Sequence, residues 1–306
     1  EMVAMSLKRE LLHTPSEGAG AEEGARRLPP DVLCSLFETL VKGGYQDTDL
    51  YLLLGRRAVR YAEMGLLSAS QIASVVSSLA TSKSMWVRPS DTEDVFRALS
   101  VPMLSMPRSV FKPKVAAVVA SAYAKARVFD ADVFRRVSEC VRWRSHKPQD
   151  FSVQVIGILL FAFSRVEVED QLLLDFLSKV IQDQSPADFT PQAVSVVVSV
   201  YAGAHKRKAL SGTQPPALPI EDLPPATGIL AHMSKVAQQM EVSSFDTRHV
   251  KAIVEAYHRA GVRPDGLYAV MRDAWGLKWG SSFESDQEMV SFLTSLELRA
   301  PGAVGE

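Results

Sequence analysis

Cysteine is scarce in this sequence, and its scarcity excludes several kinds of protein. Cys34 and Cys140 are the only two cysteines among 306 residues, and neither stands in a metal-ligand spacing. Both lie among apolar residues with helical periodicity. We therefore interpret them as buried, reduced thiols of a protein inside the cell or an organelle. The six histidines do not cluster at ligand spacing either, which argues against a metal site.

Long apolar runs and catalytic signatures are also absent. A membrane-spanning helix needs about 18 consecutive apolar residues, and Val153–Phe163 is too short to qualify. Gly43-Gly44 is not followed by the Gly-Lys-Ser/Thr of a phosphate loop, and no Gly-x-Ser-x-Gly motif occurs. Because no nucleophile stands with a matching base, we expect a protein that is not an enzyme and takes no cofactor.

Neither sign of charge is in excess. The chain has 34 Lys and Arg against 35 Asp and Glu, a formal net charge of −1. A strongly basic chain would indicate nucleic-acid binding through general attraction to phosphates. In this chain such binding has to depend on local basic patches. The length of 306 residues favours two domains or one extended repeat array.

The sequence does contain a repeat of about 40 residues. A Leu or Phe recurs along the chain, and another large residue follows twelve positions after each. The six pairs are Leu28 and Leu40, Leu67 and Leu79, Phe111 and Tyr123, Phe151 and Phe163, Phe189 and Tyr201, and Phe245 and Tyr257. We count the first member of each pair as position zero of its repeat. Such self-similarity is typical of a solenoid.

The residues after position zero predict an amphipathic helix in each repeat. Position one often holds a good N-cap residue, and position two often holds a proline, which fits the first turn of a helix. The predicted caps are Ser68, Ser152, Thr190 and Asp246, and the prolines are Pro30, Pro113 and Pro191. Positions four, five, eight and twelve are mostly apolar, which is the stripe of a helix with 3.6 residues per turn.

A second helix is predicted later in each repeat from two adjacent bulky residues and a third one three positions beyond. These sets are Leu50-Tyr51 and Leu54, Val95-Phe96 and Leu99, Val133-Phe134 and Val137, Leu172-Leu173 and Phe176, Ile229-Leu230 and Met233, and Leu267-Tyr268 and Met271. Asp49, Asp94 and Asp132 precede three of the sets, where an acid complements the positive end of a helix.

The predicted fold is therefore all-α, a right-handed solenoid of about six helix-hairpin repeats over residues 28–275. We expect an N-terminal extension and linker in residues 1–27, and a capping helix with a frayed tail in residues 276–306. The proline-rich residues 206–225 predict a long loop inserted in the fifth repeat.

Basic residues are the candidates for a functional surface. Lys125, Arg165 and Arg259 occupy position fourteen, near the end of the first helix. Cations there either complement the negative helix end or form a ladder that faces phosphates, which Arg127 would extend. A second group surrounds the third repeat, where basic residues with an interleaved tryptophan suit stacking and phosphate contact, or simply form a solvated face. This group is Arg135, Arg136, Arg142, Trp143 and Arg144, and a third is Lys206, Arg207 and Lys208.

The repeat pattern resembles a known family. Its unit reads Phe-(Ser/Thr)-Pro, then apolar residues and (Tyr/Phe)-Ala, then Asp-(Val/Leu)-(Phe/Tyr), most clearly in Phe111–Val137 and Phe189–Ala202. It is similar to the degenerate helical repeats of organellar RNA-binding proteins, above all the heptatricopeptide-type repeats of apicomplexan mitochondrial proteins related to RAP and FASTK-like proteins. The resemblance covers about residues 28–275, and we expect no RAP-like domain after it.

The resemblance implies a protein of the mitochondrial matrix that contacts RNA. We expect a non-catalytic component of a mitochondrial ribonucleoprotein, foremost the ribosome, that touches rRNA and neighbouring proteins. The near-zero net charge leaves a second interpretation open, namely a protein-only scaffold or accessory subunit of a membrane complex such as ATP synthase or a respiratory complex. One contiguous basic stripe would favour RNA, and basic residues on all faces would favour the scaffold. In both interpretations we expect no membrane span and no small-molecule substrate.

Overall fold

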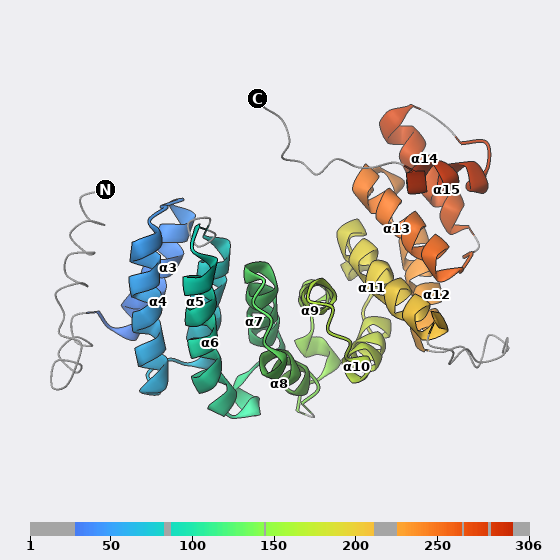
Figure 1. Ribbon diagram of the computed structural model, residues 1–306. Helices are drawn as coiled ribbons and strands as arrows, with labels where there is room; N and C mark the ends of the chain where they lie inside the picture. Colours follow the sequence, from blue (N-terminus) through green and yellow to red (C-terminus); the bar gives the residue numbers. More distant parts are fainter. Residues whose placement is uncertain are drawn as a thin grey trace. The chain divides into compact units, whose positions relative to one another are not determined.

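A computed structural model describes residues 28–82, 87–143, 145–210, 225–264, 266–280 and 283–295 (Figure 1). In these ranges all regular structure is helical and no strand occurs, so the all-α prediction is confirmed. The α-helices are α3 (Pro30–Lys42), α4 (Thr48–Glu63), α5 (Ala69–Thr81), α6 (Pro89–Ser105), α7 (Pro113–Ala126), α8 (Ala131–Val141), α9 (Val153–Arg165), α10 (Gln171–Gln182), α11 (Pro191–Leu210), α12 (Pro225–Gln238), α13 (Thr247–Ala260), α14 (Leu267–Trp279) and α15 (Asp286–Ser295).

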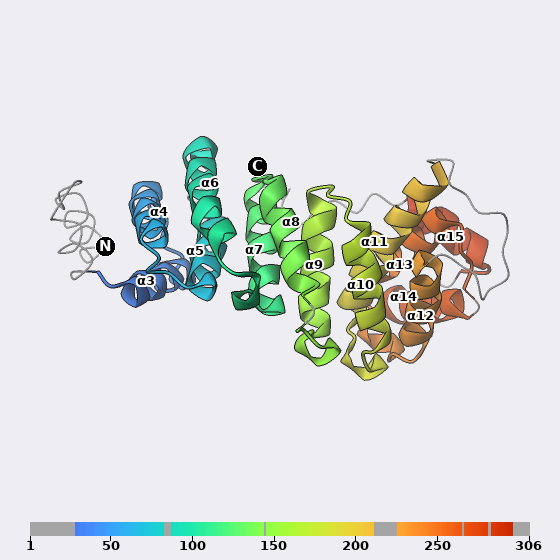
Figure 2. The same cartoon turned by 90° about the horizontal axis from the view of Figure 1, so that it is seen from below.

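The chain divides into two compact units. The first contains the chain up to Phe151 together with Phe161–Leu173, and the second contains Ser152–Leu160 and the chain from Leu174 onward. In the first unit the helices form hairpins α3–α4, α5–α6 and α7–α8. Helices α3, α5 and α7 pack side by side in one row, and α4, α6 and α8 in the other (Figure 2). In the second unit α11 packs on α13, α12 on α14, and α13 on α15. Within each unit, hairpins that follow one another in the chain are therefore stacked.

The large residues of the repeat form the core. All six residues at position zero are buried, and so are five of the six at position twelve, the exception being the half-buried Leu40. A single turn of 3₁₀ helix leads into the last four position-zero residues, whose N–H groups close it. These turns are η2 (Arg108–Val110), η3 (Pro148–Asp150), η4 (Pro186–Asp188) and η6 (Val242–Ser244).

Three tyrosines at position twelve join α7, α11 and α13 to the second helix that precedes each of them. The hydroxyls of Tyr123, Tyr201 and Tyr257 donate to the backbone carbonyls of Phe96, Leu174 and Leu230, at 2.9, 2.7 and 2.7 Å. In each case the acceptor lies 27 residues earlier in the chain. A buried tyrosine with a satisfied hydroxyl thus fixes the register between neighbouring hairpins.

The predicted helix starts are confirmed. Pro30, Pro113 and Pro191 are the first residues of α3, α7 and α11. The four predicted caps each accept a hydrogen bond from an amide of the first turn. The pairs are Ser68 with Gln71 N at 3.3 Å, Ser152 with Val155 N at 3.3 Å, Thr190 with Ala193 N at 3.2 Å, and Asp246 with His249 N at 3.0 Å.

Two details of the second helices were predicted wrongly. In α10 the side chain of Leu172 is 63% exposed while Leu173 and Leu177 are buried, so the apolar set begins one residue later than predicted. The physical reason is Asp170, whose carboxylate accepts from the Leu173 amide at 2.9 Å and sets the start of the helix.

The second detail concerns the acids predicted at the starts of three second helices. Asp49 and Asp132 lie in the first turns of α4 and α8 as predicted, but Asp47 and Asp130 are the caps. Asp94 lies in the second turn, because α6 begins at Pro89 and the first-turn acid is Asp91. An acid in the second turn is too far from the helix end to complement its dipole strongly.

The predicted loop and ends are described only in part. Helix α11 continues to Leu210, so residues 206–210 are helical and not a loop. The polar start of that insert still fits a helix, because its proline-rich part begins only later in the chain. Residues 211–224, the extension 1–27 and the tail after Ser295 lie outside the described residues. The predicted final helix exists as α15.

Candidate nucleic-acid interface

Position fourteen of the repeat places cations at the ends of first helices. Lys125 and Arg165 lie in the last turns of α7 and α9, and both are exposed. Arg259 lies in the last turn of α13 and is exposed too, but it belongs to the second unit. The negative end of each helix favours a cation at this place.

Lys42 occupies the same position in the first repeat and was missed by the sequence reasoning. It lies in the last turn of α3, its side chain is 80% exposed, and its Nζ is 3.7 Å from a carboxylate oxygen of Glu38. Its spacing of 14 residues from Leu28 would have predicted a cation at this position. In the first unit, position fourteen is therefore basic in Lys42, Lys125 and Arg165.

Arg127 and Arg165 line one hollow in the first unit. It has a volume of about 360 Å³, and Ala124, Phe129 and Val166 complete its lining. Arg127 is the residue that ends α7, and Phe129 follows in the turn to α8. The structure thus brings together two cations that stand 38 residues apart in the sequence.

Two aromatic side chains accompany these cations. Phe129 is 53% exposed, and its ring stacks on that of Phe134, with centroids 6.4 Å apart and planes inclined by 24°. Phe161 is 46% exposed, and the guanidinium of Arg165 lies over its ring, 6.0 Å from the centroid. The sequence reasoning missed both, because a phenylalanine is more often buried than exposed. The one available signal was their closeness to basic residues in the sequence.

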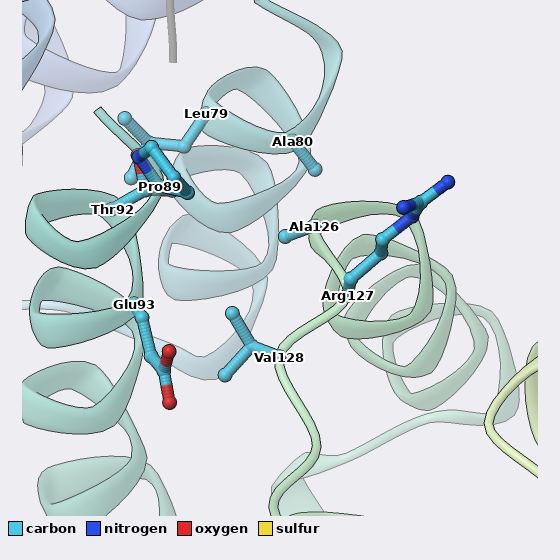
Figure 3. A pocket seen from close by; sticks show the side chains of 8 residues that line it. All are labelled: Leu79, Ala80, Pro89, Thr92, Glu93, Ala126, Arg127 and Val128. Carbon is cyan, nitrogen blue, oxygen red and sulfur yellow. The ribbon is translucent and has the colours of Figure 1, made fainter. Parts of the chain in front are cut away.

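A second hollow of about 310 Å³ shares Arg127 with the first. It is lined by Leu79, Ala80, Pro89, Thr92, Glu93, Ala126, Arg127 and Val128. Figure 3 shows that the guanidinium of Arg127 points away from the other lining side chains. Glu93 is the acidic member of the lining, and it forms an ion pair with Arg97 at 2.6 Å. This hollow is mostly apolar and offers little to an anion.

A third hollow, in the second unit, occupies the equivalent place in the hairpin α13–α14. Its volume is about 770 Å³, and its lining includes Tyr257, Gly261, Arg263, Arg272 and Asp286. Arg272 and Asp286 form an ion pair at 3.1 Å. In both units, hollows therefore lie beside the turn that joins the two helices of a hairpin.

The basic group of the third repeat is engaged within the protein. Arg135 forms an ion pair with Asp132, and the half-buried Arg136 donates to the backbone carbonyl of Leu104. The Nε atom of Arg142 donates to the Ser138 hydroxyl at 3.2 Å. These side chains and the half-buried Trp143 do not line the hollow between Arg127 and Arg165.

The remaining predicted residues are not placed as side chains. Arg144 lies outside the described residues. The backbone of Lys206, Arg207 and Lys208 belongs to α11, but their side chains lie outside the described part of the molecule. The candidate interface thus depends on Lys125, Arg127 and Arg165.

The described residues offer no metal cluster. Among them, no three His, Cys, Asp or Glu side chains gather closely enough to hold an ion. Burial raises the pKa of the Cys34 and Cys140 thiols to about 11, with nearby acids adding to the effect at Cys34. None of the described helices has the length and apolar content needed to cross a bilayer.

Comparison with protein-family models and with curated proteins finds no match for this chain. Because a fold class alone does not determine a function, the function has to be argued from the site.

Proposed function

We propose that the chain is a solenoid of about six helix hairpins that binds RNA without catalysing a reaction. It would serve as a component of a mitochondrial ribonucleoprotein such as the ribosome. The observation that carries the proposal is the hollow beside the α7–α8 turn, where Arg127 and Arg165 stand with the exposed ring of Phe129. The mitochondrial location follows from the resemblance of the repeats alone.

The chemistry of this surface suits a polyanion with aromatic bases. Arginine donates to phosphate oxygens in a fixed fork, and lysine supplies a point charge. Exposed aromatic rings stack on nucleobases whatever their identity. Lys125, Arg127 and Arg165 offer the first kind of contact, and Phe129 offers the second. The surface predicts binding through phosphates and stacking, with little reading of sequence.

A protein-only scaffold is the second candidate, and the third repeat favours it. Arg135, Arg136 and Arg142 have partners within the chain, so the densest basic segment of the sequence is not an open patch. A scaffold of this kind would be an accessory subunit of a larger complex, such as ATP synthase or a respiratory complex. Its hairpin turns would then contact acidic protein surfaces.

The test measures RNA binding by the purified full chain, using the fluorescence anisotropy of a labelled single-stranded RNA at low salt. The double variant Lys125→Gln and Arg165→Gln should weaken binding about tenfold or more, since each lost phosphate contact removes a charge-assisted bond. The matched control is Arg97→Gln with Arg135→Gln, which removes two exposed, ion-paired arginines of the same unit. Wild-type protein that does not bind RNA at low salt would overturn the proposal in favour of the scaffold.

A further inference from the structure

A left-handed backbone position recurs at the end of the first helices. At position sixteen of the first and sixth repeats the residues are Gly44 and Gly261, with φ of 65° and 68°. At the same position of the third and fourth repeats stand Arg127 and Glu167, with φ of 57° and 56°. Residues with a Cβ rarely adopt this conformation, and glycine adopts it freely. The fold therefore needs no side chain at this position.

Arg127 thus keeps a large side chain at a position where the first and sixth repeats have glycine. Residues held in such a conformation cluster at functional sites, and an observed outlier is a reason to look for a function. The side chain of Arg127 lines the hollow described above, and Arg165 lines the same hollow from the end of α9. Glycine at this position would leave the hollow with one arginine in place of two.

The aromatic wall of the hollow has one ring open to solvent. Phe129 packs on Phe134, and Phe134 in turn meets Phe163 edge to face, with centroids 5.1 Å apart. This contact chain holds the Phe129 ring in place from the core outward. Because 53% of Phe129 remains exposed, part of the ring is accessible to a flat partner.

We propose that this hollow is a subsite for one nucleotide of single-stranded RNA, with the base against Phe129 and the phosphate between Arg127 and Arg165. The inference rests on the proposed function and names the part of the RNA that this site takes. The hollow of about 360 Å³ is within the usual size range of small-ligand sites. A duplex does not fit this arrangement, since its bases are already stacked and paired inside the helix.

The test compares three single variants of the full chain. Arg127→Gly removes the cation and relieves the backbone, so it should keep or raise the melting temperature while it weakens oligouridylate binding about tenfold. Glu167→Gly is the matched control, because it gives the same backbone relief at the neighbouring repeat and removes an acid. It should bind the RNA as tightly as the wild type or more tightly. Phe129→Leu should weaken binding about tenfold through lost stacking.

The probes separate the parts of the subsite. They are labelled oligouridylate, an abasic strand of the same length and a duplex, all measured by anisotropy. Phe129→Leu should leave abasic binding unchanged, and the duplex should bind more weakly than the single strand. Wild-type protein that binds no RNA would overturn both this inference and the proposed function. Tight binding of RNA by wild type and by all three variants alike would overturn this inference and leave the proposed function standing.

Discussion

The two cysteines show at the residue scale how burial decides reactivity. The thiol pKa of about 11 at Cys34 and Cys140 leaves roughly one thousandth of each as thiolate at pH 8. We therefore predict that iodoacetamide modifies neither residue in the folded protein, and both after unfolding in urea. Mass spectrometry of the intact chain measures this. If either cysteine of the folded protein reacted as fast as a free thiol, its burial would be contradicted.

His232 in α12 gives a prediction about pH. Its Nε2 atom is buried without a hydrogen-bond partner among the described residues. Burial lowers the His232 pKa below 6.5, and the charge of Lys235 lowers it further. The unfolded state therefore takes up a proton first as pH falls. The penalty for charging the buried His232 ring is therefore absent above pH 6.5, and it lowers the stability progressively as pH falls below that value.

The variant His232→Leu tests this sign. It should raise the free energy of unfolding at pH 7 by about 1 kcal/mol, because it removes a buried nitrogen that has no partner among the described residues. It should also reduce the loss of stability between neutral and acidic pH. Urea titrations at a series of pH values measure both effects, and a pH dependence equal to that of the wild type would contradict the assignment.

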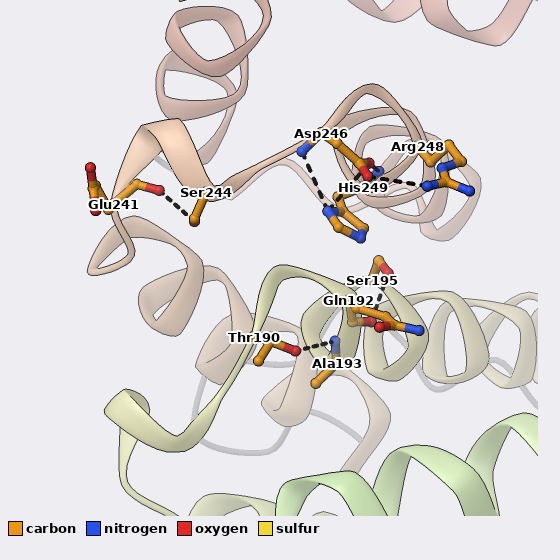
Figure 4. Close-up of polar contacts among 9 residues, drawn as sticks. All are labelled: Thr190, Gln192, Ala193, Ser195, Glu241, Ser244, Asp246, Arg248 and His249. Atoms are coloured by element: carbon orange, nitrogen blue, oxygen red, sulfur yellow. Dashed lines mark hydrogen bonds and ion pairs between the residues drawn. The ribbon is translucent and has the colours of Figure 1, made fainter. Parts of the chain in front are cut away.

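At the scale of the element, Asp246 shows what a cap contributes to a helix. Its carboxylate accepts from the His249 amide, and the His249 ring in turn lies close to the Asp246 amide (Figure 4). Burial alone raises the Asp246 pKa, but the hydrogen bond from the His249 amide and the neighbouring cations outweigh it, so the pKa is lowered from 3.8. The stability this cap contributes is therefore present above pH 3.8 and lost as pH falls through the lower folded-state value.

We predict that Asp246→Ala lowers the free energy of unfolding by about 1 kcal/mol at pH 7. The matched control is Asp273→Ala, an exposed aspartate in the interior of α14, where alanine is a better helix former and no loss is expected. Urea denaturation measures both. Equal stability of the two variants would show that the cap contributes nothing at neutral pH.

The tyrosines of position twelve connect one hairpin to the next. Tyr257→Phe keeps the ring in the core and removes only the hydroxyl that donates to Leu230. We predict a loss of about 1 kcal/mol, the usual net contribution of one buried hydrogen bond. The urea midpoint should fall without a change in the slope. Phe163 occupies the same position without a hydroxyl, so the fold itself does not require the bond.

The same elements show what the sequence could predict. Caps, prolines and buried large residues act within a few positions, so their spacing was enough to find the helices of both units. The apolar set of α10 was predicted one residue too early because Leu172, Leu173 and Leu174 are equally apolar, and only the cap at Asp170 decides which of them faces the core. Three of the four cations of position fourteen were predicted from spacing, and the same spacing also marks Lys42. The exposed ring of Phe129 could not be predicted in this way, since its exposure depends on how separate helices meet. The left-handed backbone of Arg127 is local to the end of α7, and glycine at the same position in the first and sixth repeats was the available signal.

At the scale of the whole molecule, the salt dependence of binding counts the phosphates that the chain contacts. For single strands the logarithm of affinity falls with the logarithm of salt concentration, with a slope of about −0.7 for each phosphate contact. Lys125, Arg127 and Arg165 alone would give a slope near −2. A steeper slope would mean that cations of other hairpins, such as Lys42 or Arg259, take part as well.

We predict that Lys125→Gln with Arg165→Gln makes this slope shallower by about 1.4, because two phosphate contacts are lost. The control with Arg97→Gln and Arg135→Gln carries the same change in net charge and should keep the wild-type slope. The comparison separates local contact from the attraction of the whole charged molecule. Equal slopes for both double variants would place the RNA elsewhere on the chain, since only the net charge would then matter at these positions.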